Sequence, residues 1–67
     1  MVRERRLALG LTQAQLARAA GINPRQIQKI ESGEIRLGNI TLANAARLAE
    51  ALGLTIEALL EEEAAAK

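Results

Sequence analysis

Two helix-start signals, each followed by a glycine stop, lie within residues 12–33 and constrain this chain more than any other feature. The stretch reads TQAQLARAAGINPRQIQKIESG. Thr12 followed three residues later by Gln15 has the form of a capping box, in which the two residues satisfy each other's backbone N–H groups. Asn23 followed by Pro24 marks a second start, because Asn caps free N–H groups and Pro lacks one. The stretch therefore predicts two short helices joined by a tight glycine turn.

The second of these helices, expected over residues 24–32, has two unlike sides. At 100° per residue, Ile27, Ile30 and Glu31 fall on the inward side. The outward side carries cationic, amide and hydroxyl groups, namely Arg25, Gln28, Lys29 and Ser32. An ordinary solvated helix face would mix acidic with basic residues, and the outward side of this helix has no carboxylate. Gln26, three residues after Asn23, suits a second capping box.

Caps and glycines divide the rest of the chain into three more helices. A first helix is expected over residues 2–9, with Val2, Arg6 and Leu9 along one side. Residues 34–40 form a loop with three apolar anchors, Ile35, Leu37 and Ile40. Thr41 caps a fourth helix, whose apolar stripe is Leu42, Ala45, Ala46, Ala49 and Leu52.

Thr55 caps a fifth helix, in which Ile56, Leu59 and Leu60 are the expected buried residues. Residues 61–67 contain no apolar residue larger than Ala, so this tail is expected to fray. We see neither a repeat nor a linker. The predicted fold is all-α, with five short helices in a single domain over residues 1–67.

Composition excludes several classes of function. The chain has no Cys and no His, and its single Ser lies far from any evident base. We therefore expect no enzyme, no catalytic residue, no metal site, no cofactor and no small-molecule substrate. Because no apolar run reaches the roughly 20 residues of a membrane span, no membrane partner is expected. The absence of Cys and of a signal peptide fits a reducing compartment, so the expected location is cytoplasmic.

Charge is distributed unevenly along the chain. Residues 1–37 hold seven Lys or Arg against three Glu, a net charge of +4. Residues 38–67 hold two Lys or Arg against five Glu, a net charge of −3. A basic half that faces a polyanion and an acidic half that faces away would produce this pattern. On charge alone, a chance distribution of surface residues explains it equally well.

The outward side of the second helix in the 12–33 stretch has the chemistry that reads base edges. Arg and Lys match the acceptor pair of guanine, and Gln or Asn matches the donor and acceptor of adenine. The candidate base-reading residues are Asn23, Arg25, Gln26, Gln28 and Lys29, with Arg25 and Lys29 the strongest. Helix N-termini and short polar groups bind phosphates, which gives Thr12, Ser32, Arg36, Asn39 and Asn44 as candidate phosphate contacts.

Four motifs together carry a family resemblance: L-T-Q-x-x-L-A, the G-I turn, I-x-x-I-E-S-G and L-A-x-A-L-G-L. From about residue 2 to residue 60, the chain resembles the helix-turn-helix domain of phage lambda-type repressors and Cro proteins, the xenobiotic-response-element family of bacterial regulators. The resemblance implies a lambda-repressor-like fold of five helices. It also implies that the second helix crosses the DNA backbone and that the third reads the major groove of double-stranded DNA.

The resemblance also assigns roles to individual residues. Gln13 matches a phosphate-binding position, and Arg6 with Glu31 matches an ion pair that fixes two helices. Pro24 stands where the family often has a base-reading Gln or Ser, so base reading shifts to Arg25 and its neighbours. The loop after Gly33 is longer than usual and lacks the family's common proline.

Two other classes of function stay open. One is a protein-interaction module, such as an antitoxin-like or dimerising regulator, with a surface from the fifth helix and from residues around Leu37, Ile40 and Leu60. The other is a purely structural helical bundle, which would not need a cation-rich helix face.

The composition also bears on origin. The chain has no aromatic residue, fourteen Ala residues, near-ideal caps and an EEEAAAK ending. These features favour a designed or redesigned domain, because they follow the rules that designers apply. A designed domain would bind DNA as a monomer, whereas a natural regulator would bind as a homodimer and be nucleoid-associated.

Overall fold

The computed structural model describes residues 2–65, and for residues 62–65 only the backbone. Its elements are α1 (Val2–Ala8), α2 (Gln13–Ala20), α3 (Pro24–Ser32), the 3-10 turn η1 (Leu37–Asn39), α4 (Leu42–Ala51) and α5 (Ile56–Ala65). Within this described part there is no strand. The predicted all-α fold of five short helices is therefore confirmed, with η1 as one added turn in the expected loop.

Three threonine caps set the starts of helices as the sequence predicts. The Thr12 hydroxyl accepts a hydrogen bond from the Gln15 N–H at 3.0 Å, and the Gln15 side chain accepts from the Thr12 N–H at 2.9 Å. Thr41 and Thr55 accept in the same way from the residues three positions on. These bonds satisfy donors that a helix start leaves free, so each helix begins where its cap stands.

The start of α3 differs from its prediction. The Asn23 side chain accepts from the N–H of Arg25 at 2.8 Å, which is two residues on rather than three. The second capping box expected with Gln26 is therefore wrong. Asn is short enough to close this smaller turn by itself, as Asn and Asp side chains often do.

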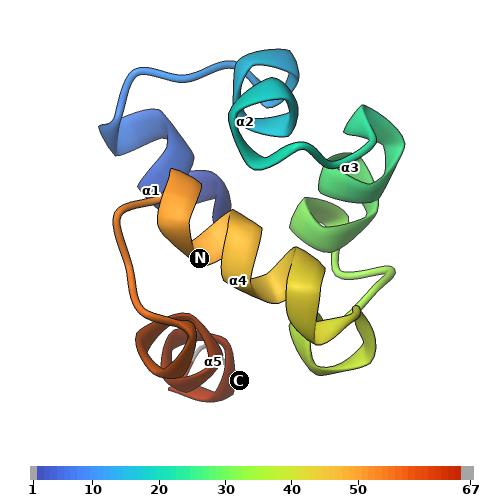
Figure 1. Cartoon of the computed structure of the whole chain (residues 1–67), viewed down its shortest axis with the longest axis vertical. Coiled ribbons are helices and arrows are strands. Elements are labelled where there is room, and N and C mark those ends of the chain that lie inside the picture. The colour runs from blue at the N-terminus through green and yellow to red at the C-terminus, as the bar shows by residue number, and fades with distance from the viewer. Residues whose placement is uncertain (1, 66–67) are drawn as a thin grey trace.

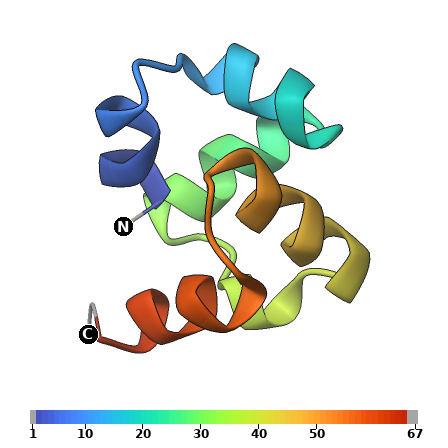
Figure 2. The ribbon, with the colours of Figure 1, turned by 60° about the vertical axis from the view of Figure 1, so that its left-hand side comes forward.

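The helices are arranged around α4. It lies between α2 and α5 and packs against both, while α1 packs against α3 (Figure 1; Figure 2). The largest fully buried side chains come from five elements, so one core joins them: Leu16, Ile27, Leu37, Leu48, Leu52 and Leu59. Among the expected loop anchors, Leu37 is fully buried, whereas Ile35 and Ile40 are half-buried against this core.

The apolar stripe of α4 is displaced from the predicted one. Leu42 is 73% exposed, and Leu48, which the predicted stripe omitted, is fully buried. The buried set is Ala45, Leu48, Ala49 and Leu52. These residues follow the i, i+3, i+4, i+7 spacing of a single helix face. Leu42 lies at the edge of this face and on the first residue of the helix, so no neighbouring element covers it.

Two other leucines differ from their predictions: Leu9 lies outside the first helix, and Leu60, predicted to be buried, is exposed. Leu9 is exposed because α1 ends at Ala8 and Leu9 belongs to the turn that follows. Leu60 follows the buried Leu59 and faces away from the core. Helix α5 continues to Ala65, so residues 61–65 have helical backbone, in keeping with the helix propensity of Glu and Ala. Fraying of the tail stays a prediction, and residues 66–67 lie outside the described part.

Candidate nucleic-acid interface

The turn between α2 and α3 fixes the relation of the two helices. Gly21 has φ +67°, a left-handed conformation that favours glycine, and its N–H points to the carbonyl oxygens of Ala17 and Arg18. The next N–H, of Ile22, donates to the Ala17 carbonyl at 2.9 Å. Ile22 is buried, so the turn is held both by backbone hydrogen bonds and by packing.

The outward face of α3, formed by Arg25, Gln28, Lys29 and Ser32, is exposed along its whole length. On the other side of the helix, Ile27 is fully buried and Ile30 nearly so. The four outward residues, together with Glu34, line a shallow open depression of about 490 Å³. A rigidly anchored helix therefore presents cationic, amide and hydroxyl groups to solvent, as the sequence predicts for these four positions.

A carboxylate does lie at the edge of this face, contrary to the sequence interpretation. Glu34 Oε2 is 3.6 Å from Lys29 Nζ. The loop folds back because the Ile35 N–H donates to the Lys29 carbonyl at 3.1 Å, and this bond brings Glu34 against the helix. The helical periodicity of α3 could not show a group that comes from the following loop. Both side chains are more than half exposed, so the pair contributes little to stability and opens readily.

Some candidate residues at the ends of α3 are already engaged within the chain. The Ser32 hydroxyl donates to the Lys29 carbonyl at 3.1 Å and accepts from the Glu34 N–H at 3.4 Å. The Asn23 side-chain oxygen caps the helix, and Gln26 is half-buried. Arg25, in the first turn of α3, and Gln28, in the middle of the helix, are exposed, and their side chains make no hydrogen bond or ion pair with residues 2–61.

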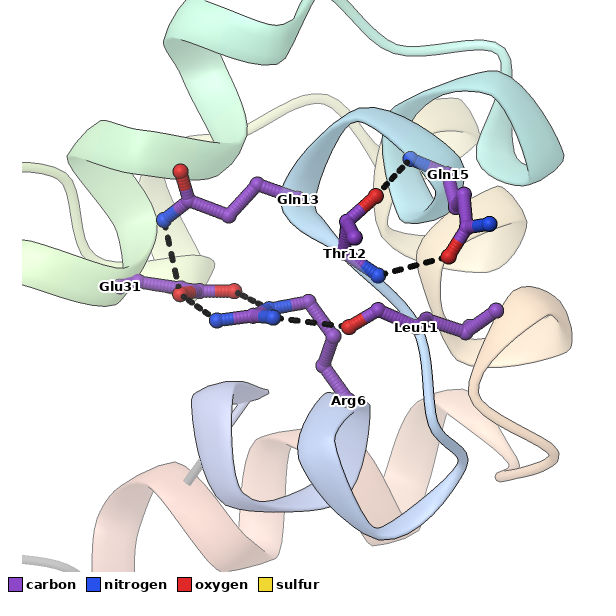
Figure 3. Close-up of polar contacts among 6 residues, drawn as sticks. All are labelled: Arg6, Leu11, Thr12, Gln13, Gln15 and Glu31. Carbon is purple, nitrogen blue, oxygen red and sulfur yellow. Dashed lines mark hydrogen bonds and ion pairs between the residues drawn. The ribbon is translucent and has the colours of Figure 1, made fainter.

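Arg6 and Glu31 form an ion pair behind this face (Figure 3). Arg6 Nε lies 2.7 Å from Glu31 Oε2, and Arg6 Nη2 lies 3.0 Å from Glu31 Oε1. Arg6 Nη1 also donates to the Leu11 carbonyl at 2.8 Å. The two charged side chains are only 9% and 4% exposed. One guanidinium thus joins α1, the turn before α2, and α3.

Gln13, the predicted phosphate contact, also belongs to this network. Its Nε2 donates to Glu31 Oε1 at 3.0 Å, and its amide oxygen points away from the carboxylate (Figure 3). Since a side-chain amide carries two N–H donors, the second is still available to a phosphate. Glu31 therefore fixes the orientation of Gln13 at the start of α2.

The environment of Glu31 keeps it ionised. Burial by itself raises the pKa of the carboxyl group, but this effect is outweighed. Hydrogen bonds from Arg6 and Gln13 lower the pKa, as do the positive charges of Arg6 and Arg3, and the net result is a pKa below the ordinary value. The same hydrogen bond raises the pKa of the Arg6 guanidinium.

The remaining candidate phosphate contacts lie in three places. Thr12 is exposed at the start of α2, but its hydroxyl is used in the capping box. Arg36 and Asn39 are exposed at η1, and Asn44 is half-buried in the first turn of α4. The structure thus gives Arg36 and Asn39 the access that a phosphate contact needs.

Arg5 has a role that the sequence analysis missed. Its Nε donates to the Leu52 carbonyl at 3.0 Å, where α4 ends. A cation at this place satisfies a free carbonyl and interacts favourably with the helix dipole. Arg5 and Arg6 both count toward the basic half of the chain, yet both act inside the fold. The family resemblance identified the role of Arg6, but no sequence signal separates Arg5 from the cations that stay free.

The fold and the α2–turn–α3 unit define a helix-turn-helix domain. The family model described as helix-turn-helix matches residues 2–59, nearly the whole chain. The chain therefore belongs to the lambda repressor/Cro-like helix-turn-helix family, a family of DNA-binding regulators. No curated protein and no solved structure matches the chain.

Among residues 2–65, no helix is long and apolar enough to cross a membrane. Among residues 2–61, whose side chains the structure describes, no three Asp, Glu, His or Cys residues lie close enough together to hold a metal ion.

Proposed function

We propose that this domain binds double-stranded DNA sequence-specifically, with α3 in the major groove. One observation carries the proposal: the outward face of α3 is fully exposed and carries two cations and an amide, while its opposite side is anchored in the core. A helix held in this way can enter the major groove and keep its side chains in a fixed register.

Three of the outward residues of α3 match base edges by their chemistry. Arg25 and Lys29 match the guanine O6 and N7 acceptors, and Gln28 matches adenine. Asn23 and Gln26 lie at the start of the helix, where they reach bases through their side-chain amides. Pro24 is exposed beside them and offers its ring to a thymine methyl group.

Contacts with phosphates on both sides of the major groove would hold α3 in a fixed position relative to the bases. Gln13 supplies its second N–H from the start of α2. The weaker candidates are Thr12, Ser32, Arg36, Asn39 and Asn44. Such contacts position the domain but carry no sequence information.

A titration of labelled duplexes over a range of salt concentrations tests the proposal. Affinity should fall steeply between about 50 and 200 mM salt, because binding releases the counterions of the contacted phosphates. Arg25→Gln should weaken binding, whereas Arg47→Gln, which removes the same charge from an exposed position of α4, should not. A flat response to salt, or equal losses in the two variants, would overturn the proposal.

The geometry favours DNA over a protein partner. Of the residues expected to form a protein-interaction surface, Leu37 is fully buried, Ile40 is half-buried, and Leu60 is 39% exposed. The expected apolar surface is thus largely occupied by the domain's own core. The stoichiometry of the duplex titration distinguishes the two assembly states: a designed domain would bind as a monomer, and a natural regulator as a homodimer.

A further inference from the structure

A second hollow lies behind the outward face of α3. It has a volume of about 270 Å³ and is lined by residues of α1, α2 and α3, namely Arg3, Arg6, Gln13, Gln28, Glu31 and Ser32. We call it the Arg3 hollow. Gln28 and Ser32 line both this hollow and the depression in front of α3, so the two are adjacent.

The Arg3 hollow carries a net positive charge. Two of its lining residues, Arg6 and Glu31, neutralise each other through a bidentate ion pair. Arg3 is exposed, and its side chain makes no hydrogen bond or ion pair with residues 2–61, the residues whose side chains the structure describes. Two cations and one carboxylate leave a charge of +1, which matches the single negative charge of a phosphodiester.

The donors around the hollow suit the oxygen atoms of a phosphate. Gln13 keeps one N–H free while Glu31 holds the other, so its amide is already oriented before any ligand arrives. Gln28, whose side-chain amide also carries N–H donors, lines the same hollow. Arg3 adds a guanidinium, whose fork of N–H donors matches phosphate oxygens better than a point charge does.

We propose that the Arg3 hollow binds one phosphate of the DNA backbone, with Arg3 as its cation and Gln13 as its oriented amide donor. The proposal rests on the DNA binding proposed above and adds a phosphate contact from α1. It places this phosphate beside the bases that α3 reads, because Gln28 borders both sites. The ion pair of Arg6 and Glu31 then has a second role, since it supports the amide that contacts the phosphate.

The test compares Arg3→Gln with Arg47→Gln, a matched loss of one exposed Arg. Removing one phosphate contact should lower the slope of log K against log salt by about 0.9, so that affinity changes about 3.5-fold less between 50 and 200 mM salt. The loss in Arg3→Gln should be the same on every duplex sequence, since phosphates are common to all. Arg47→Gln should keep the wild-type slope, and both variants should keep the wild-type thermal midpoint.

The outcomes separate this proposal from the one it rests on. If the wild-type domain binds no duplex, DNA binding itself is wrong. If it binds and Arg3→Gln behaves as Arg47→Gln does, DNA binding stands and the Arg3 hollow is not a phosphate site. If Arg3→Gln instead loses the preference for one base pair, Arg3 reads a base, and the phosphate assignment is wrong. Arg3→Lys should restore the slope, because it restores the charge.

Discussion

The two sides of α3 differ in whether their side chains find partners within the domain. On the inward side, Ile27 is packed in the core and Glu31 accepts hydrogen bonds from Arg6 and Gln13. On the outward side, Arg25 and Gln28 are exposed, and Lys29 has only a loose partner in Glu34. The inward residues anchor α3 in the fold, whereas the outward residues contribute only exposed contacts at the end of the helix, those of Ser32 and Lys29. Their chemistry is thus free to serve another molecule.

The largest expected effect on stability comes from truncating one residue on the inward side of α3, compared with one on the outward side. Ile27→Ala should lower the free energy of unfolding by about 2–5 kcal/mol, because it leaves a cavity in the core. Gln28→Ala, one residue away on the outward side, should change it by less than about 0.5 kcal/mol. Urea denaturation followed by circular dichroism measures both values. If Ile27→Ala unfolds the domain, Ile27→Val, with an expected loss of about 0.5–1.5 kcal/mol, takes its place. Similar losses on the two sides would contradict the comparison.

Lowering the pH should destabilise the domain through protonation of Glu31, on the inward side of α3. Because its pKa is lowered in the folded state, its contribution to stability is complete above the pKa of the unfolded chain, about 4.3, and is lost as pH falls through the folded value. Glu31→Gln should therefore be less stable than wild type at pH 7, and the gap should narrow below about pH 4. Thermal midpoints measured from pH 7 to pH 2.5 test this, with Glu34→Gln as the exposed control. A gap that stays constant over this range would count against the charged role of Glu31.

The smallest expected effect concerns the one ion pair of the outward side. Glu34→Gln should change stability by less than about 1 kcal/mol, because exposed pairs contribute little. It should also tighten DNA binding modestly, since it removes a carboxylate from the groove-facing edge and frees Lys29. Paired urea and duplex titrations check both effects. Weaker DNA binding in Glu34→Gln would show that Glu34 positions Lys29 or accepts from a base.

Local signals predicted most of the fold. The helix caps could be predicted from the sequence because each cap joins residues only three positions apart. The capping residues are Thr12, Thr41 and Thr55. Burial in α4 was harder to predict. Whether Leu42 or Leu48 enters the core depends on which elements surround the helix, and this is a tertiary property.

In the candidate site, too, features set by local sequence were predicted, and features set by tertiary contacts were not. The exposure of Arg25 and Lys29 follows from helical periodicity, and it was predicted. The approach of Glu34 to Lys29 and the capping of α4 by Arg5 depend on contacts between segments, and neither has a sequence signal. The same is true of Arg3, which only the packing of α1 against α3 brings beside Gln13 and Glu31.

Selection of bound duplexes from a randomised library, carried out in parallel with the wild-type domain and with Arg25→Ala, tests the central claim most directly. We expect the wild type to enrich a short motif, because one domain reads only a few base pairs. Arg25→Ala should recover the same motif with the preference at one position relaxed, at a cost of about 1–3 kcal/mol in binding. Enrichment of no motif by the wild type, or of an unchanged motif by Arg25→Ala, would contradict base reading by the outward face of α3.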